Sequence, residues 1–292
     1  MTKDRRESLR HALASALAQE GEIEVLVVDD GSADGTAEMV RADFPGVRLE
    51  RFSSSAGLVV RRNFAVRVAR APVVVSIDDD AVFTAPDVVA QTLRDFDHPR
   101  IAAVAVPYVD VRHGDAQLQR APDDDVPWVG ATFRGTAFAV RRAEFLALGG
   151  FREAIFHQGE EADFTLRMLD AGWLVRFGRA APIHHFESPT RSLRRMYVYG
   201  RRNEILLCFT YLPFPGNVLI ALGYAAKGVR HTPRRQIPSS LRGIVLGVRD
   251  SWRLRSQRRP VRWRTVWLDR RLRLAGGLPL DEVERWLPDR DA

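Results

Sequence analysis

The sequence contains a single cysteine, Cys208, among its 292 residues. One cysteine forms no intramolecular disulfide, and it excludes a metal site built from several thiolates. A chain without disulfides suits a reducing compartment. The first ten residues, MTKDRRESLR, also lack the apolar stretch of a secretory signal peptide. We therefore expect a cytoplasmic protein.

Acidic residues are scarce near the C-terminus, although the whole chain carries a formal charge of only +7. Between Lys227 and Arg273, fifteen Lys and Arg residues accompany two acids. Such a block suits an anionic membrane surface, a phosphorylated acceptor or a nucleic acid. No nucleic-acid-binding motif accompanies it, so we expect no nucleic-acid partner. The alternative is an ordinary solvated face, because Arg outnumbers Lys along the whole chain.

Residues 205–226 contain no charged residue, and this segment is just long enough to span a bilayer. Pro213, Pro215 and Gly216 interrupt this segment, so a straight spanning helix is not expected. With the basic block beside it, the segment predicts two helices that lie on an anionic membrane, at its inner face. The alternative is that the segment packs against the rest of the protein.

Strand-like and helix-like segments alternate along the first two thirds of the chain. Apolar runs typical of buried strands occur at 24–28 and 73–77, and an alternating run occurs at 47–52. Helical patterns cover 8–19, 36–42, 58–70, 85–96, 145–151 and 160–173, and extended patterns cover 101–111 and 131–140. This order predicts an α/β fold with a doubly wound, mostly parallel sheet. We expect this domain at residues 1–200, followed by a helical, basic C-terminal appendage at 201–292.

Two groups of carboxylates directly follow predicted strands. Asp29 and Asp30 end the run at 24–28, and three aspartates end the run at 73–77. In such sheets, ligands bind beyond the carboxyl ends of the strands. Asp78 and Asp80 can reach the same side, while Asp79 points away. Converging carboxylates require a cation, and hard oxygen ligands favour Mg²⁺ or Mn²⁺. A solvated acidic loop is the alternative.

The order of these motifs resembles that of the family 2 glycosyltransferases. The motifs are VVDDGSADGT, a helix with RRN, SIDDDAVF, RGTAFAVRR with LGGF, and GEEADFTLR, and the resemblance covers most of residues 8–205. It implies a GT-A fold, a nucleoside diphosphate sugar donor, a divalent cation (Mn²⁺ or Mg²⁺) and a glycan or lipid-linked acceptor. It also implies hexosyl or deoxyhexosyl transfer with inversion, in cell-surface polysaccharide or glycolipid synthesis.

The resemblance assigns nucleotide-binding roles to residues in the first two motifs. Asp29 would hold the nucleotide base, with Asp30 and Ser32 beside it. Arg62 and Asn63 would face the nucleotide from their helix. As alternatives, Asp30 and Ser32 serve only the turn and the helix cap, and Arg62 is an ordinary surface cation.

The aspartate triplet resembles the family's Asp-x-Asp motif. Asp78 and Asp80 would bind the metal, with Asp80 the direct ligand, and Asp78 and Asp79 would contribute to the nucleotide-sugar site. A histidine after a later strand resembles the family's histidine near the diphosphate or metal. His185 is the first candidate and His184 the second, and a packed imidazole is the alternative.

Two glutamates stand where the family has Glu followed by Asp, and that Asp is the family's general base. Glu161 occupies the position of the base and Glu160 precedes it. The resemblance therefore implies that Glu161 removes the proton from the acceptor hydroxyl, and Glu160 is the second candidate. The alternative is that both residues only cap a helix.

Two other functions are compatible with the pattern. A nucleotidyltransferase shares the strands, the carboxylates and the metal, but it usually has a glycine-rich phosphate loop that is not seen here. A catalytically inactive scaffold at a membrane surface is the second.

The family also begins with an apolar strand before the helix that matches residues 8–19, whereas this sequence starts at MTKDRRESLR. We expect either that Met1 is not the natural start or that the natural product is inactive.

Overall fold

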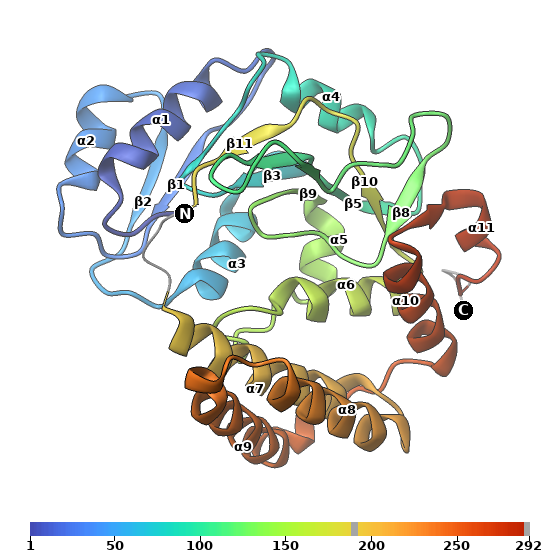
Figure 1. The fold of residues 1–292 in the computed structure, drawn as a ribbon. Coiled ribbons are helices and arrows are strands. Elements are labelled where there is room, and N and C mark those ends of the chain that lie inside the picture. The colour runs from blue at the N-terminus through green and yellow to red at the C-terminus, as the bar shows by residue number, and fades with distance from the viewer. Residues whose placement is uncertain (188–191, 289–292) are drawn as a thin grey trace.

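The apolar run at 73–77 forms β3 (Val73–Ile77), one edge of the main sheet (Figure 1). The computed structural model describes residues 1–187 and 192–288, and within them this sheet has six strands in the order β12–β8–β10–β5–β9–β3. The other five are β5 (Ile101–Ala105), β8 (Trp128–Gly130), β9 (Ala137–Arg141), β10 (Leu174–Phe177) and β12 (Leu278–Pro279). The pairings make β12, β10, β5 and β3 run in one direction, opposite to β8 and β9.

The helices of the first two thirds lie where the apolar spacing predicts them. They are α1 (Arg6–Leu17), α2 (Thr36–Asp43), α3 (Leu58–Val68), α4 (Val88–Arg94), α5 (Arg142–Ala147) and α6 (Glu160–Asp170). Helices α3, α5 and α6 cover one face of the main sheet with a cluster of phenylalanines. Side chains alternate across a strand, so Phe138 and Val140 join this cluster, while Ala137 and Ala139 face the opposite core.

A second sheet brings the later strands beside the end of β3. Among the described residues its order is β4 (Ala81–Val82), β11 (Ile183–His185), β6 (Tyr108–Asp110) and β7 (Gln117–Leu118). The extended pattern at 101–111 is therefore two strands, β5 and β6. Pro107 separates them, because proline has no N–H to donate to a ladder.

The first two predicted strands pair with each other and not with β3. β1 (Leu26–Asp29) and β2 (Arg48–Arg51) form a parallel pair, which is a sheet of its own within the described residues. An apolar slot of about 370 Å³ lies between β1 and β3, and Leu13, Val27 and Val75 are among its lining residues. Thr2 forms one parallel bridge at the end of β1, where its N–H donates to the Val28 carbonyl at 2.9 Å.

The C-terminal region has two parts. Helices α7 (Leu193–Tyr211), α8 (Gly216–Arg230) and α9 (Ile237–Arg253) form a helical layer beneath α6, with short 3₁₀ turns at Arg234–Gln236 and Arg255–Gln257 (Figure 1). The chain then returns through α10 (Trp263–Ala275), β12 and α11 (Leu280–Glu284). Leu268, Leu272 and Val283 complete the core of the main sheet, so only part of the predicted appendage is separate from it. The boundary at residue 200 stays a prediction.

Within residues 1–187 and 192–288, the structure contains no helix with the length and apolar character needed to cross a bilayer. The uncharged segment 205–226 is divided between the end of α7 and the start of α8.

The slot generates a stability prediction. We expect that five apolar residues added before Met1 pair with β1 and β3 and fill the slot. Burying several apolar side chains stabilises a fold by several kcal/mol, which corresponds to a rise of roughly 5 °C or more in Tm. Calorimetry would compare this chain with one extended by five Gly and Ser residues. Equal melting temperatures for the two extensions would contradict the prediction.

Candidate active site

Two arginines neutralise the three adjacent aspartates that follow β3. Nη2 of Arg62, on α3, donates to Oδ1 of Asp78 at 2.8 Å. Nη1 of Arg5, just before α1, donates to Asp79 at 3.2 Å and also to Asp80. Arg62 was expected from the sequence to lie near this site, whereas Arg5 was not. The run KDRR, which contains Arg5, has no motif that indicates a partner more than seventy residues away.

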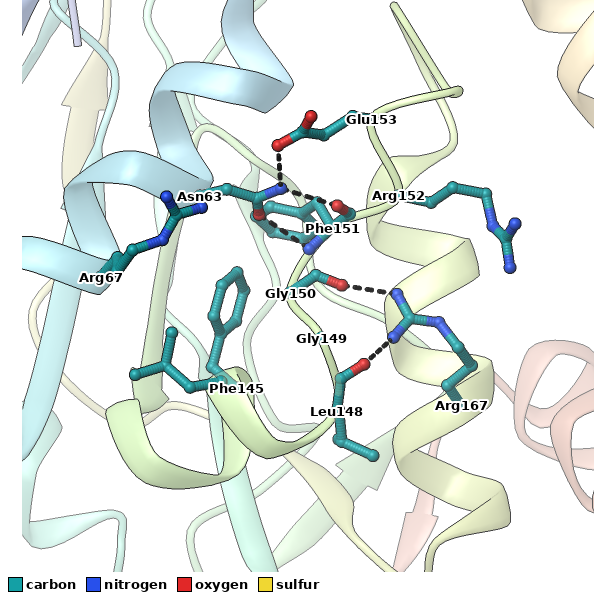
Figure 2. Close-up of a pocket in the computed structure, with 11 residues that line it drawn as sticks. Asn63, Arg67, Phe145, Leu148, Gly149, Gly150, Phe151, Arg152, Glu153 and Arg167 are labelled. Atoms are coloured by element: carbon teal, nitrogen blue, oxygen red, sulfur yellow. Dashed lines mark hydrogen bonds between the residues drawn. The ribbon is translucent and has the colours of Figure 1, made fainter. Parts of the chain in front are cut away.

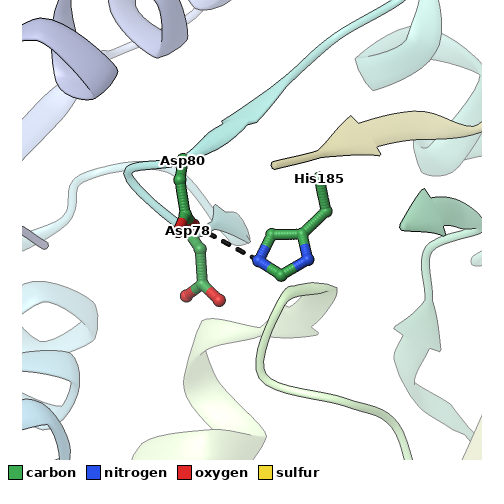
Figure 3. Close-up of side chains that lie close together, drawn as sticks. All are labelled: Asp78, Asp80 and His185. Carbon is green, nitrogen blue, oxygen red and sulfur yellow. Dashed lines mark ion pairs between the residues drawn. The ribbon is translucent and has the colours of Figure 1, made fainter. Parts of the chain in front are cut away.

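Two of the aspartates and His185 form a group that can hold a metal ion (Figure 3). One ligand atom from each of Asp78, Asp80 and His185 lies within 4.8 Å of the others. His185 projects from β11 toward the turn after β3, and its Nε2 lies 3.3 Å from Oδ1 of Asp80. Two carboxylates and an imidazole suit Mn²⁺, so the residues fit the predicted ion. Asp79 is outside this group, as the alternation of side chains predicts.

The two histidines of β11 face opposite ways. His185 is buried, and His184 is exposed. Residues 188–191, the end of the segment in which these histidines were identified, lie outside the described residues. The structure therefore brings only the first-choice histidine to the aspartates.

The charges in this group reinforce one another. Burial alone lowers the pKa of His185, but the hydrogen bond and charge of Asp80 raise it above its ordinary value. Burial alone raises the pKa of Asp80, but His185 and Arg5 lower it overall. Burial raises the pKa of Asp79. A cation that binds Asp80 and His185 therefore competes with a proton on the imidazole.

Asp110, at the end of β6, lies behind His185, and no motif in the sequence singled it out. Its Oδ2 lies 3.6 Å from Nδ1 of His185. At this distance the two atoms make no hydrogen bond, so Asp110 acts on the imidazole through its negative charge. Asp110, His113 and Glu187 form a second group with ligand atoms within 4.8 Å of one another. Parallel pairing of β6 with β11 brings Asp110 opposite His185.

Asp29 keeps one carboxylate oxygen free of hydrogen bonds within the described structure. The side chain is fully buried, and its Oδ1 accepts the Ser32 N–H at 2.9 Å. Its Oδ2 has no hydrogen-bond partner there, and the Arg51 guanidinium lies 3.8 Å away. A buried acceptor without a donor costs free energy, so a ligand N–H at this point would be stabilised.

Asp30 uses both oxygens to hold the loop before α3. It accepts hydrogen bonds from Ser55 Oγ, the N–H groups of Ala56 and Gly57, and Nε of Arg61, at 2.6–3.0 Å. Burial alone raises the pKa of Asp30, but these hydrogen bonds lower it overall. These contacts agree with the purely structural alternative, and a role for Asp30 in nucleotide binding stays a prediction.

Ser32 also serves its own turn. Its N–H donates to Asp29, and its Oγ accepts the Asp4 N–H at 2.9 Å. Ser32 thereby ties the turn after β1 to the residues before α1. Its assignment to the nucleotide site stays a prediction.

Arg62 and Asn63 point to different sides of α3. Arg62 faces the aspartates, whereas Asn63 lines a hollow of about 480 Å³ (Figure 2). The Asn63 amide donates to the Phe151 carbonyl at 2.7 Å and accepts the Phe151 N–H at 2.8 Å. It also donates to Glu153 at 3.3 Å. Asn63 therefore holds the loop after α5, and its predicted contact with a nucleotide stays a prediction.

Gly150, in this loop, has a steric reason. Gly150 has a φ of +65°, and a Cβ there would lie 2.7 Å from Oδ1 of Asn63. Arg167 closes the other side by donating to the carbonyls of Leu148 and Gly150 at 2.5 and 2.7 Å (Figure 2). The LGGF motif is therefore explained by packing around Asn63.

Glu160 and Glu161 begin α6, on the side of Arg62 away from the aspartates. Oε1 of Glu160 lies 3.6 Å from Nη1 of Arg62, and Oε1 of Glu161 accepts the Gly135 N–H at 2.9 Å. Burial and the neighbouring Glu161 raise the pKa of Glu160 to about 7. Burial also raises the pKa of Glu161. Two adjacent carboxyl groups with raised pKa values are typical of sites that exchange protons near neutral pH.

Gly135 allows this arrangement, and the sequence did not single it out. Its carbonyl accepts Nη2 of Arg62 at 2.7 Å, and its N–H holds Glu161. A Cβ at this position would lie 2.5 Å from Oε1 of Glu161 and closer still to Arg62. The RGT motif therefore supplies a close approach that only glycine permits.

Parts of this chain are similar in sequence to known proteins. A sequence model described as "Glycosyl transferase family 2" matches residues 1–148. The succinoglycan biosynthesis protein ExoU of Rhizobium meliloti is 34% identical over 84 residues, which is 28% of this chain and 25% of ExoU. The uncharacterized glycosyltransferase YfnE of Bacillus subtilis is 37% identical over 94 residues, 30% of this chain and 24% of YfnE. The matched segments span about a quarter of the length of these relatives.

Solved glycosyltransferase structures share the fold. The mannosyltransferase PcManGT of Pyrobaculum calidifontis, in complex with GDP-Man and Mn²⁺, superposes with a TM-score of 0.55 at 18% identity, over 88% of this chain and 81% of that one. TarS of S. aureus in complex with UDP-GlcNAc gives a TM-score of 0.61 at 16% identity, over 94% and 85%. At these identities the comparison concerns the fold alone, and it confirms the predicted α/β, GT-A-like architecture.

The metal group gives a direct test. Asp80→Asn should lower the affinity for Mn²⁺ at least about tenfold, because it removes a carboxylate from the three-residue group. Asp79→Asn is the matched control, since Asp79 is outside the group. Isothermal titration of Mn²⁺ into the wild type and both variants measures this. Unchanged affinity in Asp80→Asn, or an equal loss in Asp79→Asn, would refute the assignment.

The raised pKa of Glu160 predicts a pH-dependent stability. An unfolded Glu loses its proton near its ordinary pKa of 4.5, whereas Glu160 in the folded chain keeps it up to about 7. The folded state binds more protons in this window, so wild-type stability falls as pH rises from 4.5 to 7. Glu160→Gln removes this loss. Chemical denaturation should find the variant more stable at pH 8, by roughly 3 kcal/mol at most, and near wild type at pH 5. A difference independent of pH would contradict this prediction.

Proposed function

The chain belongs to glycosyl transferase family 2, and we propose that it transfers a sugar from a nucleoside diphosphate sugar to an acceptor hydroxyl, with inversion at the anomeric carbon. One observation supports this above all others. Arg62 contacts a carboxylate of the metal-binding group on one side and the glutamate pair on the other. A group for a diphosphate-bound cation and a group for proton removal thus lie on either side of one guanidinium.

Asp78, Asp80 and His185 would hold Mn²⁺ or Mg²⁺. When bound, such an ion supplies positive charge that stabilises a diphosphate leaving group. Asp110 would add negative charge behind the imidazole of His185, 3.6 Å from its Nδ1. The Mn²⁺ in the PcManGT complex supports this choice of cation.

Glu161 is the proposed general base. Its raised pKa increases its basicity, and the Gly135 N–H fixes one of its oxygens. Its carboxylate takes the proton of the acceptor hydroxyl as the hydroxyl oxygen bonds to the anomeric carbon. The bond from that carbon to the diphosphate oxygen breaks on the opposite face, and its electron pair leaves with the diphosphate. Glu160 limits the negative charge beside the base because it stays protonated to about pH 7.

Asp29 is the proposed contact for the nucleotide base. Its free, buried Oδ2 suits an N–H donor at a base edge. Uracil and guanine, the bases in the UDP-GlcNAc and GDP-Man complexes of the structural neighbours, both carry such a group. Asp30, Ser32, Arg62, Asn63 and Asp79 would complete the donor site, directly or by shaping it.

We further propose that the acceptor is a glycan or lipid-linked sugar of the cell envelope, at the inner face of the membrane. The name of the relative ExoU, a succinoglycan biosynthesis protein, supports a role in polysaccharide synthesis.

A thermal-shift screen tests the donor. Binding to the folded state raises Tm by mass action, so UDP-, GDP-, ADP- and TDP-sugars would be compared with and without Mn²⁺. We expect a rise for one nucleotide class that is larger with Mn²⁺. Slow hydrolysis of that donor would then show catalysis. Pyrophosphate release from a nucleoside triphosphate would instead indicate a nucleotidyltransferase, and binding without turnover of any kind an inactive scaffold.

The two glutamates can be separated by substitution. Glu161→Gln should keep donor binding and lower turnover about 10²-fold or more, because Gln accepts no proton. Glu160→Gln should lower it less. Donor hydrolysis rates, with donor affinity measured in parallel, are the readout. A larger loss in Glu160→Gln would reverse the two roles, and full activity in both variants would leave them only as helix caps.

A further inference from the structure

Helix α9 packs on α7 through glycines. A Cβ on Gly243 would lie 2.8 Å from Cβ of Arg201, and a Cβ on Gly247 would lie 2.7 Å from Cβ of Ile205. Real side chains do not approach so closely, so this face of α9 admits only small residues. Ser240 and Asp250 complete the buried face. Large apolar residues are therefore excluded from this buried face, and Ile237, Ile244 and Leu246 are only half-buried.

Four other apolar side chains of α9 point outward. Leu241, Val245, Val248 and Trp252 are 47, 67, 53 and 71% exposed. They are spaced by three or four residues, so they form one stripe along a helix of 3.6 residues per turn. An ordinary amphipathic helix turns such a stripe to the core. In α9 the core side is small and polar, and the solvent side is apolar.

Helix α8 repeats this reversal in part, although its Ala221 and Ile220 also pack with Ile205 and Cys208 of α7. Gly228 is buried, and a Cβ there would lie 2.7 Å from Cδ of Arg201 on α7. Leu219 and Leu222 are 64 and 62% exposed, and Phe214, in the connection before the helix, is 76% exposed. Two helices of one layer (Figure 1) thus carry exposed apolar side chains. We call these exposed residues of 214–253 the α8–α9 surface.

The charge of the α8–α9 surface has a single sign. Residues 214–253 contain seven Lys and Arg and one acid, Asp250, which is buried and paired with Arg202 and Arg249. Arg242, Arg249 and Arg253 each follow a residue of the apolar stripe, so they line one flank of it. An apolar stripe beside a row of cations is the pattern of helices that lie in a membrane interface.

We propose that the α8–α9 surface binds an anionic lipid bilayer, with the stripe at the boundary of headgroups and acyl chains and the arginines on lipid phosphates. Apolar side chains removed from water and cations near the lipid phosphates would both strengthen this binding. Trp252, the most exposed tryptophan, has the ring type that prefers this boundary. A second copy of the chain is disfavoured, because its face would carry the same positive charge.

The α8–α9 surface would be the part of the chain that contacts the membrane named in the proposed function, on which this proposal rests. The experiment reads binding and not sugar transfer, so its failure and the failure of that function are distinguishable. The probes are vesicles of phosphatidylcholine alone and vesicles with about a third of phosphatidylglycerol.

Three double variants carry the test. Val245→Ser with Trp252→Ser removes apolar area, and Arg242→Gln with Arg253→Gln removes charge. Leu93→Ser with Arg94→Gln is the matched control, since it makes the same kind of change on exposed residues of α4, at the opposite end of the molecule (Figure 1). All these side chains are exposed, so melting curves should coincide with that of the wild type.

Flotation at low salt should recover the wild type and the control with anionic vesicles, more weakly with neutral vesicles, and less at high salt. The apolar and the charge variants should each bind anionic vesicles at least about tenfold less. Absence of wild-type flotation at low salt would overturn the proposal, as would wild-type binding by either variant. A wild-type dimer in sedimentation that the apolar variant loses, with no vesicle binding, would assign the surface to a second copy and also overturn it.

Discussion

Three consecutive carboxylates at the end of a buried strand repel one another, and the fold supplies the cations that neutralise them. Arg5 comes from the start of α1 and Arg62 from α3, so the packing of two helices depends on the charge of one turn. Partial burial weakens screening by water and strengthens this dependence. A metal ion bound by Asp78 and Asp80 would compete with both arginines for the same oxygens.

Arg62 connects this turn to the glutamate pair. It contacts Asp78, the Gly135 carbonyl and Glu160, and its own side chain is largely buried. The guanidinium lowers the pKa of Glu160, yet burial and the charge of Glu161 outweigh it and leave that pKa at about 7. One arginine therefore joins two groups with opposite requirements. The aspartates need positive charge beside them to offset their own. The two glutamates need raised pKa values, so that they bind protons readily.

The C-terminal helices differ from the rest of the chain in which side chains they bury. In the main sheet, large apolar residues such as Phe138 and Phe164 form the core, and the glycines near them serve turns and close approaches. In α8 and α9, glycines make close contacts with α7, joined by Ala221 of α8, while several leucine and valine side chains and Trp252 remain exposed. Because exposed apolar area costs free energy in water, this layer favours a partner with an apolar surface.

The sequence by itself determined the local elements and the kinds of residue at the site. β3 and the start of α6 lie at the predicted residues, because apolar periodicity and turn residues act over a few neighbours. The order of motifs also predicted a histidine near Asp78 and Asp80, and its role at a metal stays a prediction. Only the tertiary structure separated Arg62 from Asn63 and brought Arg5 and Asp110 to the aspartates. It also left β1 and β3 in different sheets. These outcomes depend on contacts between residues distant in sequence, and no local pattern records which face of a helix or edge of a strand will meet which partner.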